Sequence, residues 1–133
     1  MESLRKFFVM LNSRMIYRVQ TAHVIRSVAL SFVSVYVPAF LLTHGFSLRE
    51  TVLFFVAYHG IGLIAVFVVV IPMLRKWGLV ATIRWYYPLQ MLFLGVLLLG
   101  NGEISSVWMA AVAGGIANMI YYVPLNVLFM RHT

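Results

Sequence analysis

Long, nearly uncharged runs of apolar residues are the feature that most limits what this chain can fold into. Four such runs cover about residues 26–44, 48–74, 79–100 and 106–130. A helix of roughly 20 apolar residues crosses the ~30 Å hydrocarbon core of a bilayer, whereas a barrel strand needs only about ten alternating residues. The runs therefore predict an all-α membrane protein with four transmembrane helices.

The composition supports this interpretation. Of the 133 residues, 63% are hydrophobic and 10% are charged, whereas soluble domains contain about a quarter charged residues. A water-soluble fold of this composition would expose a large contiguous apolar surface, which soluble proteins rarely tolerate. The lipid bilayer is therefore the expected surrounding of residues 23–133, the predicted four-helix domain.

The basic residues are distributed as in a membrane protein and not as in a nucleic-acid-binding protein. Of the ten Lys and Arg residues, only Arg49 falls in a segment expected on the outer side. The other nine precede the first span, surround the turn after the second, or follow the fourth. Because Lys and Arg accumulate in cytoplasmic loops, both termini are predicted to be cytoplasmic in a multi-pass protein of the cell (cytoplasmic) membrane. No nucleic-acid partner is expected.

Residues 1–22 carry apolar side chains at helical spacing, among them Leu4, Phe7, Phe8 and Leu11. The basic residues of this segment lie mostly off that stripe. The pattern predicts an amphipathic helix that lies in the membrane interface, with a mobile basic arm as the alternative.

The second predicted helix has chemical signals at both ends. Ser47 and Glu50 have the spacing of a capping box, so the helix is expected to begin at Leu48. The short basic turn Arg75-Lys76-Trp77-Gly78 is expected to end it. His59 lies about 16 Å from the outer end, near the membrane midplane, where an ionisable residue indicates function. A neutral histidine that hydrogen-bonds a neighbouring helix is the structural alternative.

Polar side chains of the first and fourth runs share single helical faces. Ser31 and Ser34 lie on the same face as Pro38, and this face either packs closely against another helix or lines an aqueous cavity. Asn118, Tyr122 and Asn126 follow spacing of four on the fourth helix. The small residues before Asn118 predict close approach of neighbouring helices. The candidate cavity and substrate residues are Ser31, Ser34, Tyr58, His59, Asn118, Tyr122 and Asn126.

The remaining segments are expected to be structural. The third run is apolar from Met91 to Leu99 apart from Gly95, which suits exposure to lipid. Ser105 or Ser106 is expected to cap the fourth helix.

Several kinds of chemistry are not expected. No helix core contains Asp, Glu or Lys, which argues against a proton-coupled exchanger built on a membrane-embedded carboxylate. The chain has no cysteine, and His44 and His59 differ by about 15 Å in membrane depth, so one haem could not use both. We therefore expect no enzymatic activity, no cofactor and no metal site.

The order and spacing of the predicted helices resemble those of the first four helices of a major facilitator superfamily transporter. The similarity lies in the Tyr36-Val37-Pro38 segment of the first helix and in Gly45-Phe46-Ser47, which leads directly into the second. It continues in the basic turn, where the family motif is G-x-x-x-D-[RK]-x-G-[RK]. Lys76 and Gly78 match this motif, whereas Ile71, Arg75 and Leu79 replace its first Gly, its Asp and its last basic residue.

The resemblance implies a fold and a function. In this family the first and fourth helices line the central cavity and the third faces lipid. Arg75, Lys76 and Gly78 would form the cytoplasmic motif turn. A complete transporter has about twelve helices in two halves with the substrate between them. The implied function is therefore alternating-access transport of an unknown small solute, as an N-terminal fragment or as a subunit completed by further transmembrane helices, a second copy or a partner. A non-transporting four-helix subunit that docks a larger membrane complex is the alternative.

Overall fold

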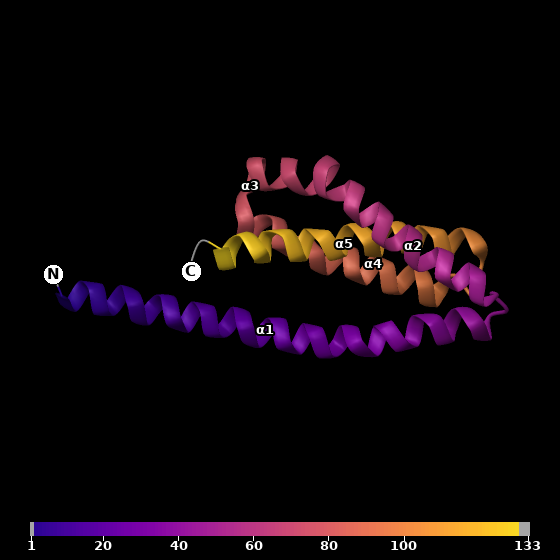
Figure 1. Ribbon diagram of the computed structural model, residues 1–133, viewed down its shortest axis with the longest axis horizontal. Coiled ribbons are helices and arrows are strands. Elements are labelled where there is room, and N and C mark those ends of the chain that lie inside the picture. Colours follow the sequence, from indigo (N-terminus) through magenta and orange to yellow (C-terminus); the bar gives the residue numbers. More distant parts are fainter. Residues whose placement is uncertain (1, 131–133) are drawn as a thin grey trace. The chain divides into compact units, whose positions relative to one another are not determined.

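The backbone is helical almost throughout, and residues 2–130 contain no strand. The computed structural model describes the backbone of residues 2–130 and the side chains of Tyr17 and of residues 20–130. Figure 1 shows the elements, which are α1 (Glu2–Thr43), α2 (Leu48–Ala65), the π-helix η1 (Val66–Val70), α3 (Ile71–Arg84), α4 (Tyr86–Leu99) and α5 (Ile104–Met130). The predicted all-α fold is confirmed for these residues. The chain divides into two compact units, Met1–Phe40 and Leu41–Thr133.

The first unit consists of most of helix α1. This helix runs without a break from Glu2 to Thr43, so the expected amphipathic segment and the expected first span form one continuous helix. The side chains of residues 1–16 lie outside the described residues, and the amphipathic interpretation stays a prediction. Within the expected span, the Ser31 hydroxyl donates to the Ser27 carbonyl at 2.9 Å and the Ser34 hydroxyl donates to the Ser31 carbonyl at 2.7 Å.

The capping box at the start of α2 is confirmed. The Glu50 amide donates to the Ser47 hydroxyl oxygen at 3.3 Å, and the Ser47 amide donates to the Glu50 carboxylate at 2.7 Å. Two of the backbone donors at the start of the helix are satisfied in this way. Helix α2 begins at Leu48, as the sequence predicts.

The π-helix η1 separates α2 from α3 without breaking the helical course. Pro72 has no amide to donate to the carbonyl four residues earlier, and its ring crowds that carbonyl. Just before it, the Ile71 amide donates to the Val66 carbonyl, five residues back. The helix therefore widens by one residue ahead of the proline, which is a known way to accommodate the lost bond.

The end of the second predicted span differs from the expected four-residue turn. Arg75, Lys76 and Trp77 remain helical, and only Gly78 leaves the helical region, with φ 80° and ψ 176°. A positive φ costs little in glycine because it has no Cβ. Beyond the break, the buried Thr82 hydroxyl donates to the Gly78 carbonyl at 2.7 Å and fixes the next helical turn.

The third predicted span, residues 79–100, is interrupted. Residues 79–84 belong to α3, and a turn at Trp85 separates them from α4. Pro88 explains the interruption, since it cannot donate to the Arg84 carbonyl and crowds it. Helix α4 has 14 residues and is about 21 Å long, shorter than a ~30 Å hydrocarbon core.

The last helix begins earlier than expected. Asn101 and Gly102 adopt positive φ values of 47° and 76° in the turn before it, and α5 begins at Ile104. The expected cap at Ser105 or Ser106 is wrong. The buried Ser106 hydroxyl instead donates to the carbonyls of Glu103, at 2.7 Å, and Gly100, at 3.2 Å.

Helix α5 is the central element of the second unit, and it packs against α2 and α4 (Figure 1). The face of α2 turned inward carries Thr51, Phe54, Gly62 and Ala65, all buried and spaced by three or four residues or a multiple of these. On α4 the buried residues are Tyr86, Phe93 and Leu97. The expected lipid exposure of the third run therefore holds for one face only, because the other face packs on α5.

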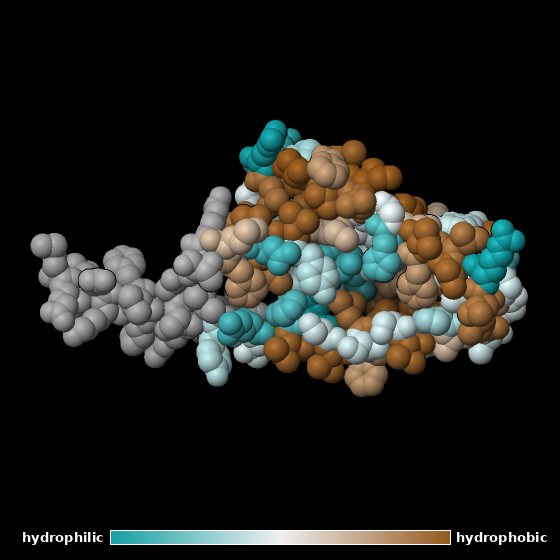
Figure 2. Space-filling view, viewed as in Figure 1, coloured by the Kyte–Doolittle hydropathy of each residue, from teal (hydrophilic) through white to brown (hydrophobic). Residues whose placement is uncertain are grey.

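The outer faces of the second unit are apolar and exposed. Large hydrophobic side chains are exposed along several helices, including Val52, Val56 and Leu63 of α2, Phe67 of η1, Met91 and Leu99 of α4, and Met109 and Val112 of α5. Figure 2 shows this apolar surface in brown. Three stretches are long and apolar enough to cross a membrane, Gln20–Thr43, Leu48–Arg84 and Ile104–Met130, and α4 is a shorter apolar helix. Such a surface suits lipid and not water, and the chain is a membrane-embedded, all-helical protein.

Candidate functional site

The contact between α2 and α5 is built from glycines. A Cβ on Gly115 would collide with the Tyr58 carbonyl oxygen, and a Cβ on Gly114 would lie 2.6 Å from the Tyr58 ring and 2.8 Å from the Phe93 ring. A Cβ on Gly62 would lie 3.0 Å from the Gly115 carbonyl oxygen. The two backbones therefore approach as closely as small residues permit in membrane helix pairs. The close approach predicted for the small residues before Asn118 is confirmed at these glycines.

Tyr58 lies at the centre of this contact. Its ring centroid is 6.3 Å from that of Phe54, 6.1 Å from that of Phe93 and 5.1 Å from the imidazole of His59. Phe93 reaches this cluster from α4, so three helices meet at Tyr58. Phe93 was missed in the sequence because it lies in the apolar run expected to face lipid. Its spacing of seven and four residues from Tyr86 and Leu97 is the signal that marks a packed face.

A second aromatic cluster joins α4 and α5 further along. The rings of Tyr86 and Tyr121 have centroids 5.0 Å apart, and Tyr122 is 5.8 Å from Tyr121. Tyr86 and Tyr121 are buried, whereas Tyr122 is half-buried. The phenol of Tyr122 therefore lies at the edge of a packed aromatic layer.

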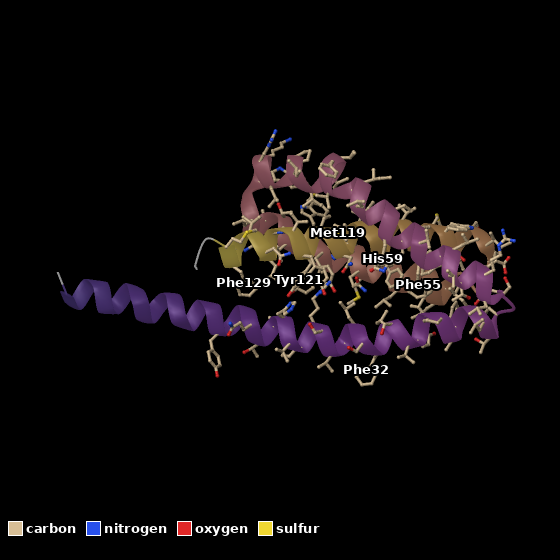
Figure 3. All side chains as sticks on the ribbon, viewed as in Figure 1. Phe32, Phe55, His59, Met119, Tyr121 and Phe129 are labelled. Carbon is tan, nitrogen blue, oxygen red and sulfur yellow. The ribbon has the colours of Figure 1, made fainter. Side chains whose placement is uncertain are left out.

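His59 lies on the outer face of α2. Its side chain is exposed, and so are those of Val52, Val56 and Leu63, which share its face at spacings of three, four and seven residues. Figure 3 labels His59 on α2 and Met119 on α5. His59 is thus an ionisable group within an exposed apolar stripe, in the first half of the helical stretch Leu48–Arg84, which is long enough to cross a membrane.

The candidates of α5 occupy one helical face but differ in burial. Asn118 and Tyr122 are half-buried and follow Gly115 at spacings of three and seven, so they continue the face that meets α2. Met119, on the same face, contacts the position of Gly62, where a Cβ would lie 3.2 Å from its Cγ. Asn126, two turns beyond Asn118, is exposed. Helical spacing therefore places Asn118 and Tyr122 on the face of α5 that carries Gly115, and Gly115 lies against Tyr58.

The serine candidates belong to the first unit. Ser31 and Ser34 are exposed on α1, and each hydroxyl donates to a carbonyl of its own helix. Their assignment to a cavity stays a prediction, as does the cavity role of the other candidates.

The motif-like turn is exposed in the second half of the long helical stretch Leu48–Arg84. Arg75, Lys76 and Gly78 are all exposed, and the side-chain nitrogen of Lys76 is 5.9 Å from the ring centroid of Trp77. Across Gly78, the rings of Trp77 and Trp85 stack with centroids 5.9 Å apart and planes at 24°.

Among the described residues, no group of three or more His, Cys, Asp or Glu side chains is placed to hold a metal ion. Comparison of the chain with protein-family models, with curated proteins and with solved structures finds no match in any of the three. The resemblance to the major facilitator superfamily therefore stays a prediction. The class that the fold defines is an all-helical protein embedded in a membrane.

Proposed function

We propose that the chain forms part of a pathway that moves a small solute across the membrane by alternating access. The position of His59 carries this proposal. Its imidazole is exposed midway along α2, on the same face as the exposed side chains of Val56 and Leu63. An ionisable side chain in the hydrocarbon core is costly and, in membrane proteins, faces a polar partner or a water-filled cavity. A solute pathway along this face of α2 provides such surroundings.

The half-buried polar groups at the α2–α5 contact support the same proposal. Solute sites of transporters lie near the midplane, between two groups of helices. Tyr58, Asn118 and Tyr122 carry phenol and amide groups at such a contact, and His59 adjoins Tyr58. The pathway would be completed by further transmembrane helices, supplied by a longer chain, a second copy or a partner subunit. In this proposal the assembly is of the major facilitator type.

A second candidate function is a non-transporting subunit that docks a larger membrane complex. The serine hydroxyls of α1 favour this docking function. Ser31 and Ser34 donate their hydrogen bonds to carbonyls of their own helix, so they need no aqueous cavity. In this case a polar side chain of a partner helix would cover His59. The transport function requires water around residue 59, whereas the docking function does not, so the access of water to this residue distinguishes the two.

The absence of native cysteine makes the test direct. We expect a His59→Cys variant, in the intact membrane assembly, to react with a hydrophilic, membrane-impermeant maleimide. Ile64→Cys is the matched control, since Ile64 is exposed on the same helix and lies about 140° around it from His59. It should stay unlabelled in membranes, and both thiols should react in detergent. If the thiol at residue 59 reacts only after detergent is added, the pathway is contradicted and the docking function is supported.

A further inference from the structure

The end of the long helical stretch carries exposed cations beside a stacked tryptophan pair. This surface consists of Arg75, Lys76, Trp77, Arg84 and Trp85, and we name it the basic-aromatic turn. Trp77 and Trp85 are 46% and 49% exposed, although their rings stack on each other at 5.9 Å. The two tryptophans are eight positions apart in the sequence and lie on either side of the break at Gly78. A hydrophilic patch lies at the place of α3 in Figure 2.

The charge of this surface has no acidic counterpart nearby in the sequence. Arg75, Lys76 and Arg84 are exposed, and residues 51–102 contain no Asp or Glu. Glu50 lies at the opposite end of α2, where its carboxylate accepts hydrogen bonds from Ser47. The basic-aromatic turn is therefore suited to an anionic partner from outside the chain.

The length of the helical stretch places the turn at the depth of lipid headgroups. Residues 48–77 would span about 45 Å at ~1.5 Å per residue, which exceeds a ~30 Å hydrocarbon core and equals about the thickness of a bilayer with its headgroups. When the capped end at Ser47 lies at one surface, the basic-aromatic turn lies in the headgroup layer of the other. Tryptophan is enriched at this depth because its ring is apolar and its N–H is polar.

We infer that the basic-aromatic turn binds the headgroup phosphate of an anionic phospholipid. Arginine recognises phosphate oxygens with paired N–H donors, and Lys76 adds a point charge. The half-exposed faces of Trp77 and Trp85 offer apolar contact to the glycerol and upper acyl region of the same lipid. Free phosphate would use the cations but not the tryptophan rings, so a lipid fits the whole surface. This inference rests on the membrane-embedded fold and does not depend on solute transport.

Fluorescence of the tryptophan pair can test this binding directly. In a Trp108→Phe background, with excitation at a wavelength that tyrosine does not absorb, only Trp77 and Trp85 emit, because the chain has three tryptophans. The full chain is reconstituted in phosphatidylcholine vesicles with brominated phosphatidylglycerol or brominated phosphatidylcholine. We expect stronger quenching by the brominated anionic lipid, and we expect this preference to fall about fivefold for each cation neutralised in Lys76→Gln and Arg75→Gln.

Two control variants test whether the lipid preference depends on the cations of the basic-aromatic turn. Arg49→Gln removes an exposed charge at the opposite end of α2 and should leave the preference unchanged, and Arg75→Lys should retain most of it. Circular dichroism verifies that each variant keeps its helix content. The inference is overturned if Lys76→Gln and Arg75→Gln keep the wild-type preference, if Arg49→Gln lowers it equally, or if millimolar inorganic phosphate abolishes it.

Discussion

At the scale of single residues, the packing of the second unit depends on glycines, which have no Cβ. Gly115 lies against the Tyr58 carbonyl oxygen with no room for a Cβ, and Gly114 lies against the rings of Tyr58 and Phe93. The sequence predicts close approach in this part of α5 from its run of small residues. It does not predict which residue is approached, because the rotation of α2 about its axis is set by its packing against α5.

We expect Gly115→Ala to destabilise the protein by about 1–3 kcal/mol, the usual cost of overpacking a filled core. The added methyl group would meet backbone, which cannot rotate away as a side chain could. Unfolding of purified protein in mixed micelles with increasing SDS, followed by circular dichroism, measures this change.

Gly60→Ala is the matched control for this experiment. Gly60 is an exposed glycine of α2, and a Cβ there would have nothing within 4 Å. Its stability should stay within about 1 kcal/mol of wild type or rise slightly, since alanine favours helix. Equal losses in the two variants would contradict the assigned α2–α5 contact.

At the scale of elements, local chemistry decides where helices start and stop. The start of α2 was predictable because a capping box requires only residues three apart in sequence. The breaks at Gly78 and Trp85 were harder to predict, since a count of apolar residues is the same for a straight and a kinked helix. Pro88 and Pro72 are visible in the sequence, but a proline in a membrane helix is tolerated in several ways, so the π-helix at Val66–Val70 could not be foreseen.

The capping box gives a prediction at this scale. We expect Ser47→Ala to cost about 1 kcal/mol, because the amide of Glu50 would lose its acceptor. Ser47→Thr keeps the hydroxyl and should retain most of the stability. The same SDS titration compares the two variants. A Ser47→Thr variant as unstable as Ser47→Ala would show that the hydroxyl does not cap α2.

At the scale of the whole molecule, we expect α2, η1 and the first half of α3 to cross the bilayer from one surface to the other. This stretch carries the capped end at Ser47, His59 near its middle and the basic-aromatic turn at its far end. The apolar composition predicts that the chain is embedded in a membrane, since so much exposed hydrophobic surface suits lipid and not water. The arrangement of α4 and α5 around this stretch was not predictable in the same way, because apolar helices have many alternative ways to pack in lipid.

The position of the two ends of this stretch on opposite membrane surfaces is the central claim, and thiol labelling of sealed vesicles tests it most directly. The chain has no native cysteine, so Arg49→Cys and Lys76→Cys each carry a single thiol. In right-side-out vesicles we expect an impermeant maleimide to label residue 49 from outside, and to label residue 76 only after the vesicles are opened. Labelling of both thiols from the same side would contradict a membrane crossing between them.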